Sequence, residues 1–182
     1  MNYDFDALFA LAKDCGFDEI GMLDPETLEF MPEVRDMCSS DKCNNYNRSW
    51  SCPPSPACGS LEDNAKRCKE YSTGFIVQVV ARMEDEFDIE TMMDAPKRFG
   101  ACFLELSDKL KEMGLDILPM GAGGCTRCKK CTYPDEPCRF PDKLYSSMEA
   151  SGLLVSKVCT DNNMPYYYGP NTIAYTGCIL LK

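Results

Sequence analysis

Thirteen cysteines and no histidine occur among the 182 residues of this chain, and most of the cysteines are concentrated in two segments. Histidine is the commonest metal ligand and the usual general base, so its absence leaves thiolate, carboxylate, backbone or exogenous groups to hold a metal. Thiolates favour iron–sulfur clusters, zinc or cuprous copper. The chain must therefore fold so that it presents two cysteine-rich loops, and metal binding is the first function to consider.

Disulfide bonds are the alternative use of so many cysteines, and they require an oxidising compartment. The first six residues include Asp4 and Asp6 where a signal peptide carries basic residues. No apolar run approaches the roughly 20 residues needed to span a bilayer. The odd number of cysteines would also leave one thiol unpaired. We therefore expect a reduced, cytoplasmic protein without a membrane segment.

The sharpest motif is Cys125-x2-Cys128-x2-Cys131. Spacings of two residues let one tight loop supply three thiolates to a cluster, as in bacterial ferredoxins, where a fourth cysteine and a proline follow. Here the next cysteine is Cys138, and Pro141 follows it. Structural zinc sites instead use two C-x2-C pairs with a longer spacer. These four cysteines therefore predict a 4Fe-4S cluster, with zinc as the alternative.

A second set of cysteines lies in a proline-rich segment, at positions Cys38, Cys43, Cys52 and Cys58. The segment has little apolar periodicity, and a loop of this length is usually functional or disordered. The pair Cys52-Pro53 resembles the end of a ferredoxin run. We expect these four cysteines to hold a second 4Fe-4S cluster; a zinc site or inert cysteines are the alternatives.

The division of ligands between the two clusters is open at this point. In two-cluster ferredoxins the fourth cysteine of one run binds the other cluster. By that logic Cys52 would join the C-terminal run and Cys138 would join the N-terminal set. The five remaining cysteines are expected to behave mostly as small buried hydrophobic residues, and this assignment is weakest for Cys68. They are Cys15, Cys68, Cys102, Cys159 and Cys178.

Hydrophobic periodicity predicts alternating helices and strands in the rest of the chain. Helices are expected at 4–15, 60–71, about 95–113, and 144–162 with an interruption near Gly152; strands are expected at 19–23, 74–81 and 115–120, with a terminal hairpin of 166–168 and 172–181. This mixture predicts one α+β domain over residues 1–182, with helices packed on a small mixed sheet. The cysteine-rich loops would occupy about 38–59 and 121–141.

The formal net charge of −10 argues against nucleic-acid binding, which needs a basic surface. The C-terminal cysteine run nevertheless carries four basic residues, Arg127, Lys129, Lys130 and Arg139. They would stabilise an anionic cluster or guide a redox partner protein, or they are ordinary solvated charges. The oligomeric state does not follow from the sequence.

Several of these segments together resemble a family of predicted metal-binding proteins of unknown function. The resemblance is carried by Trp50-Ser51-Cys52-Pro53-Pro54, the Cys125 run, Cys138-Arg139 and Ser147-Met148-Glu149-Ala150. It implies metal binding, and it makes Glu149 a candidate functional residue against the alternative of a solvated helix position. Residues 5–23 also bear a fainter resemblance to the epoxyqueuosine reductase and corrinoid-dependent reductase group, whose members carry two 4Fe-4S clusters.

Three functions are compatible with these observations. The first is electron transfer, in which one or two clusters relay electrons to a partner redox enzyme. The second is an enzyme, as an oxidoreductase or a component of one, or a metal-handling accessory protein with a labile cluster site. The third is a binding module that zinc only stabilises. The sequence predicts no substrate and no catalytic residue.

Overall fold

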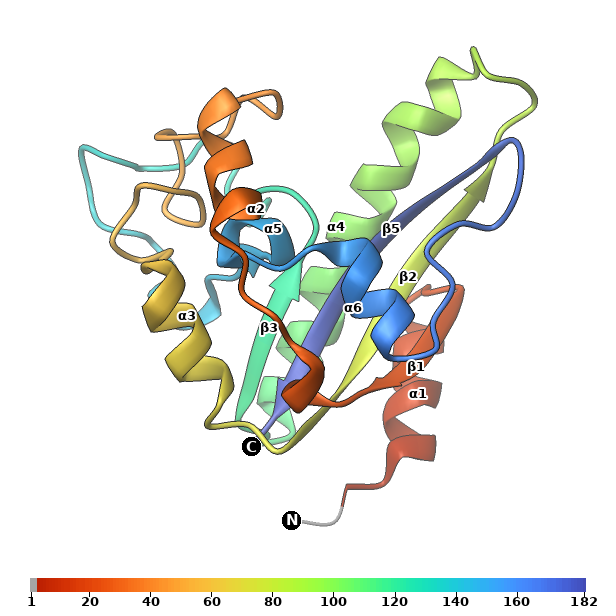
Figure 1. Ribbon diagram of the computed structural model, residues 1–182, viewed down its shortest axis with the longest axis horizontal. Helices are drawn as coiled ribbons and strands as arrows, with labels where there is room; N and C mark the ends of the chain where they lie inside the picture. The colour runs from red at the N-terminus through yellow and green to blue at the C-terminus, as the bar shows by residue number, and fades with distance from the viewer. Residues whose placement is uncertain (1–2) are drawn as a thin grey trace.

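A five-stranded mixed sheet forms the centre of the fold in the computed structural model, which describes residues 3–182 (Figure 1). The strands are β1 (Glu19–Leu23), β2 (Thr73–Arg82), β3 (Ile117–Gly121), β4 (Ser146–Ser147) and β5 (Thr172–Leu181). Their order in the sheet is β1-β2-β5-β3-β4, and every neighbouring pair is antiparallel except β3 with β4. The predicted α+β class with a small mixed sheet is confirmed.

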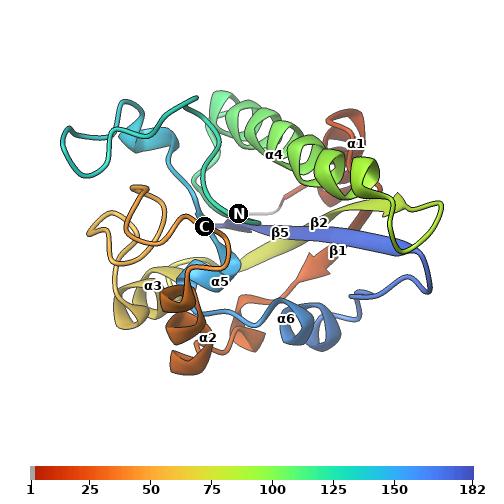
Figure 2. The same cartoon turned by 90° about the horizontal axis from the view of Figure 1, so that it is seen from above.

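Helices cover both faces of this sheet (Figure 2). They are α1 (Phe5–Asp14), α2 (Pro32–Met37), α3 (Leu61–Cys68), α4 (Ile89–Glu112), α5 (Met148–Ser151) and α6 (Val155–Asp161), with short 3-10 turns at Pro25–Thr27, Cys38–Ser40 and Pro141–Lys143. Helices α1 and α4 lie on one face, whereas α2, α3, α5 and α6 lie on the other. No helix in the described part of the chain is both long enough and apolar enough to cross a membrane.

The alternation of side chains along β2 supplies a core on each side of the sheet. Phe75, Val77 and Val79 pack with aromatic and aliphatic residues of α1 and α4, whereas Ile76 packs with residues of α5 and α6. Gly177 of β5 has no side chain, and a Cβ there would lie 2.9 Å from the rings of both Phe99 and Phe103. The glycine therefore lets the stacked rings of α4 approach the sheet closely.

Three expectations about the elements need correction. The predicted terminal hairpin is wrong, because 166–168 forms no strand and β5 pairs with β2 and β3 instead. Helix α4 begins at Ile89 rather than near residue 95, since the Asp88 carboxylate accepts a hydrogen bond from the Thr91 N–H and caps it. The expected interruption of 144–162 at Gly152 is confirmed, but the segment begins with the short strand β4 and its helices α5 and α6 are short; α2 was not predicted at all.

The two cysteine-rich loops leave the framework at the same end of the sheet (Figures 1 and 2). One loop follows α2, and the other begins directly after β3 at Gly121. Residues 1 and 2, the start of the acidic N-terminal segment, lie outside the described residues. The framework thus brings together two segments that are about 80 residues apart in sequence.

Replacement of Phe103 by alanine is expected to lower the free energy of unfolding by roughly 3–5 kcal/mol, because the ring is fully buried and its loss leaves a cavity. The same substitution at Phe87, which is 82% exposed, serves as the matched control. It is expected to change stability by about 0.5 kcal/mol or less. Denaturant unfolding of both variants measures the difference, and equal losses would contradict this description of the core.

Candidate metal centre

Four cysteines of the C-terminal loop line one cavity of about 540 Å³: Cys125, Cys128, Cys131 and Cys138. Ser49 and Trp50 of the other loop complete its wall. All four thiols belong to half-buried residues, so the cavity is open to solvent on one side. Its donor set consists of soft thiols, which suit an iron–sulfur cluster or zinc.

The surroundings of Cys131 favour ionisation of its thiol. Burial opposes the charged form, but the backbone N–H groups of Tyr133 and Trp50 and the hydroxyl group of Ser49 outweigh it, so the pKa of Cys131 is lowered. Burial instead raises the pKa of Cys125. Donors from both loops therefore converge on one thiol, which is the kind of environment that stabilises a thiolate ligand.

Trp50 links the two loops at the rim of this cavity. Its indole Nε1 donates a hydrogen bond of 3.0 Å to the carbonyl oxygen of Glu136, and its ring packs edge-on against Tyr133 at a centroid distance of 5.0 Å. The Tyr133 hydroxyl group in turn donates to Asn47 at 3.0 Å. Trp50 therefore packs the two loops against each other.

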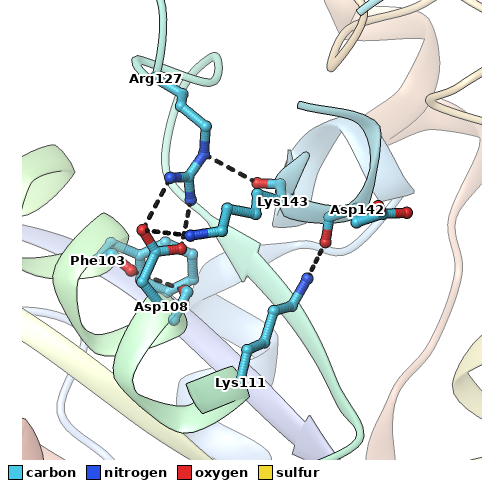
Figure 3. A network of polar contacts seen from close by, with 7 residues as sticks. Phe103, Asp108, Lys111, Arg127, Asp142 and Lys143 are labelled. Carbon is cyan, nitrogen blue, oxygen red and sulfur yellow. Dashed lines mark hydrogen bonds and ion pairs between the residues drawn. The ribbon is translucent and has the colours of Figure 1, made fainter. Parts of the chain in front are cut away.

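An ion pair fastens the C-terminal loop to the framework (Figure 3). Both terminal nitrogens of Arg127 donate to the carboxylate of Asp108 on α4, each at 2.9 Å, and its Nε donates to the Lys143 carbonyl at 3.2 Å. The hydrogen bond from Arg127 lowers the pKa of Asp108. Arg127 is therefore a structural clamp, whereas Lys129, Lys130 and Arg139 are exposed.

Three cysteines of the N-terminal loop and one carboxylate line a second cavity of about 630 Å³. They are Cys38, Cys43, Cys52 and Glu149. Burial raises the pKa of Cys52 to about 11 and also raises the pKa of Glu149. The side-chain oxygen Oε2 of Glu149 is buried and finds no hydrogen-bond partner within residues 3–182. Glu149 is therefore not the solvated helix residue of the alternative interpretation.

Cys58 lies beside the second cavity, and it is not among the residues that line it. Its side chain is fully buried, and its Sγ lies 3.7 Å from the Ala150 carbonyl oxygen. Arg35 holds this region together by donating to the Ala150 carbonyl and, at 2.6 Å, to the Gly59 carbonyl. The backbone at Gly59 and the backbone at Ala150 are thus cross-linked through one guanidinium group.

Ser51 connects the two sets of cysteines. Its hydroxyl oxygen accepts a hydrogen bond of 3.0 Å from the backbone N–H of Cys125 and lies 3.6 Å from the Sγ of Cys52. The residue is completely buried. The two cavities are therefore neighbours that share a polar contact through one side chain.

The structure groups the candidate ligands by loop. Cys138 lines the cavity of the C-terminal run, and Cys52 lines the cavity of the N-terminal set. Across residues 3–182, no three Cys, Asp or Glu side chains converge as closely as the ligands of a single metal ion. In a 4Fe-4S cubane each thiolate binds a different iron, so its ligands surround a space rather than a point. The identity of the ligands stays a prediction.

The other five cysteines lie within the packed framework. Cys15 and Cys102 belong to the core beneath α1 and α4, whereas Cys68, Cys159 and Cys178 belong to the core on the opposite face. Burial raises the pKa of each of these thiols. They pack as small hydrophobic residues, and Cys68 lies among them rather than in the N-terminal loop.

Sequence reasoning missed Ser51, Arg35 and Asp108 as parts of this region. Ser51 stood only within the Trp50–Pro54 segment that carries the family resemblance, and nothing in its spacing indicates a contact with Cys125. The sequence pattern places Asp108 at a helix position where a solvent-exposed side chain is expected. These contacts join segments distant in sequence, so periodicity carries no signal for them.

Replacement of Asp108 by asparagine is expected to lower the free energy of unfolding by roughly 1–2 kcal/mol, between the values for exposed and buried ion pairs. The variant leaves the half-buried Arg127 without its charged partner. Glu105→Gln, which breaks an exposed ion pair on the same helix, is the control and should change little. Thermal unfolding at neutral pH measures both, and a Glu105→Gln loss as large as that of Asp108→Asn would contradict the clamp.

Comparison with known proteins supports metal binding by this chain. Residues 21–181 match the family described as predicted metal-binding protein (DUF2284). The chain has no significant match among curated proteins or among solved structures. The match includes all eight cysteines of the two loops and nearly the whole framework. The chain therefore belongs to this family of predicted metal-binding proteins.

Proposed function

We propose that the protein is a two-cluster iron–sulfur protein that transfers electrons to a partner redox enzyme. Cys125, Cys128, Cys131 and Cys138 would hold one 4Fe-4S cluster, and the second would lie among Cys38, Cys43, Cys52 and Cys58. Each cluster, when bound, supplies reversible one-electron chemistry. The fainter resemblance of residues 5–23 to reductases with two 4Fe-4S clusters agrees with two clusters in this chain.

The proximity of the two cysteine sets is the observation that carries this proposal. The Ser51 hydroxyl group contacts the Cys125 backbone and the Cys52 thiol at the same time. Electron transfer between two centres requires that they be close, and a protein needs no substrate pocket to perform it. The polar groups around the thiols, including Ser49 and the amides near Cys131, would tune the reduction potential through hydrogen bonds to sulfur.

The exposed basic residues beside the first cavity suggest the character of the partner. Lys129 and Arg139 line the cavity, and Lys130 is exposed next to them, on a chain whose formal net charge is −10. A local positive surface on an acidic protein steers an acidic partner toward that face. We therefore propose a redox protein with an acidic docking face as the partner, in the cytoplasm.

A second candidate function is a metal-handling accessory protein, or an oxidoreductase component with a labile cluster site. The carboxylate of Glu149 in the second cavity favours it, because an oxygen donor differs from the thiols that surround it. Zinc that only stabilises the loops is the third candidate. Metal analysis separates zinc from the other two candidates directly.

Anaerobically purified protein is expected to contain about eight irons and a matching amount of acid-labile sulfide per chain. Cys128→Ser and Cys43→Ser should each reduce the iron content by about four, since each removes a ligand from a different cluster. Cys102→Ala, in the framework core, is the control and should retain the full content. Zinc without sulfide would overturn the proposal, as would a protein without an EPR signal after dithionite reduction and iron–sulfide reconstitution.

Replacement of Ser51 by alanine is expected to lower the reduction potential of the N-terminal cluster. A hydroxyl group that donates to the Cys52 sulfur stabilises the more negative, reduced state, and a hydrogen bond of about 1 kcal/mol corresponds to roughly 40 mV. EPR-monitored redox titration measures the shift. Ser39→Ala removes an exposed hydroxyl group whose bond goes to the Asp36 carbonyl, and it should leave the potential unchanged. An unchanged potential in Ser51→Ala would contradict the bridging role.

A further inference from the structure

Glu149 has a feature that neither helix formation nor packing explains. Its Oε2 atom is buried and lacks a hydrogen-bond partner in the described part of the chain. Burial of a carboxylate without a partner is costly, so buried carboxylates are paired, protonated or bound to a metal. The side chain lines the second cavity together with Cys38, Cys43 and Cys52, so the unpartnered oxygen belongs to a residue that shares this cavity with three thiols.

The guanidinium group of Arg35, which lies near this cavity, already donates hydrogen bonds to backbone carbonyl groups. Burial raises the pKa of the Cys38 thiol despite the nearby guanidinium group of Arg35, whose two terminal nitrogens donate to the carbonyl oxygens of Ala150 and Gly59. No ion pair involves Glu149 within residues 3–182. The carboxylate therefore lacks a compensating charge from the protein itself.

Cys58 is the weaker candidate for the fourth position of this site. Its thiol is fully enclosed and directed at the Ala150 carbonyl oxygen, 3.7 Å away. Asn64 fixes the backbone of the same residue through a hydrogen bond of 3.0 Å to its carbonyl oxygen. Cys58 is absent from the cavity lining, although it lies near Cys52 and Cys38, whereas Glu149 lines the cavity together with the three other thiols.

We propose that Glu149 is the fourth ligand of the N-terminal site, in place of Cys58, and that this site holds its metal through three thiolates and one carboxylate. The inference rests on the proposed iron–sulfur function for the nature of the metal. An oxygen ligand is harder than a thiolate and binds iron of a cluster less tightly. The iron bound by Glu149 is therefore the one open to exchange with an external ligand, and the C-terminal cluster has only thiolate ligands.

The test compares three variants with wild-type protein after anaerobic purification. Glu149→Gln keeps the shape of the side chain and removes the charged oxygen ligand, Cys58→Ala removes the competing thiol, and Glu33→Gln changes an exposed glutamate of α2 as the matched control. Iron, zinc and sulfide are quantified per chain, and EPR of the oxidised protein detects a three-iron cluster. The C-terminal cluster, which none of the variants touches, reports whether each variant is folded.

Glu149→Gln is expected to lose about one of eight irons and to show the three-iron signal, whereas Cys58→Ala and Glu33→Gln retain the wild-type content. Full iron content in Glu149→Gln, or a loss in Cys58→Ala instead, would overturn the assignment while leaving the two-cluster proposal intact. Zinc without sulfide in the wild type would overturn the iron–sulfur proposal. In that case a lower zinc content in Glu149→Gln alone still supports Glu149 as the ligand, and equal zinc content refutes it.

Discussion

The antiparallel pairing of β5 with both β2 and β3 is the constraint on which the rest of the molecule depends. Ten consecutive residues of β5 lie opposite β2, and the other edge of β5 receives β3. This central position buries both faces of β5 and separates two cores that different helices cover. It also places the end of β3 where the second cysteine loop must begin.

The cysteine loops contribute little to these cores, so polar contacts hold them in position instead. Arg127 anchors one loop to α4, Arg35 cross-links the backbone around the other, and Trp50 joins the two. A fully occupied metal site would add to this stability, because metal that binds only the folded state stabilises it. The loops and the cavities therefore depend on contacts between segments that are distant in sequence.

Local patterns were sufficient to predict most of the framework. Apolar residues at helical spacing predicted α1 and most of α4, and the β-branched run predicted β2. The prediction of a terminal hairpin was wrong because residues 172–181 pair with strands that are distant along the chain. The true partners, β2 and β3, are selected by burial of both faces, which a local pattern does not encode. The predicted start of α4 was wrong because the cap formed by Asp88, rather than apolar periodicity, determines where the helix begins.

The sequence by itself determined the chemistry of the site. Eight cysteines in two segments, with no histidine, restrict any metal centre to thiolate and oxygen donors. Only the tertiary structure decided which of them share a cavity, that Ser51 connects the two cavities, and that Glu149 lines a cavity together with three of the cysteines. The physical reason is that ligand type is a property of the residue, whereas proximity and burial arise when the sheet brings the two loops together.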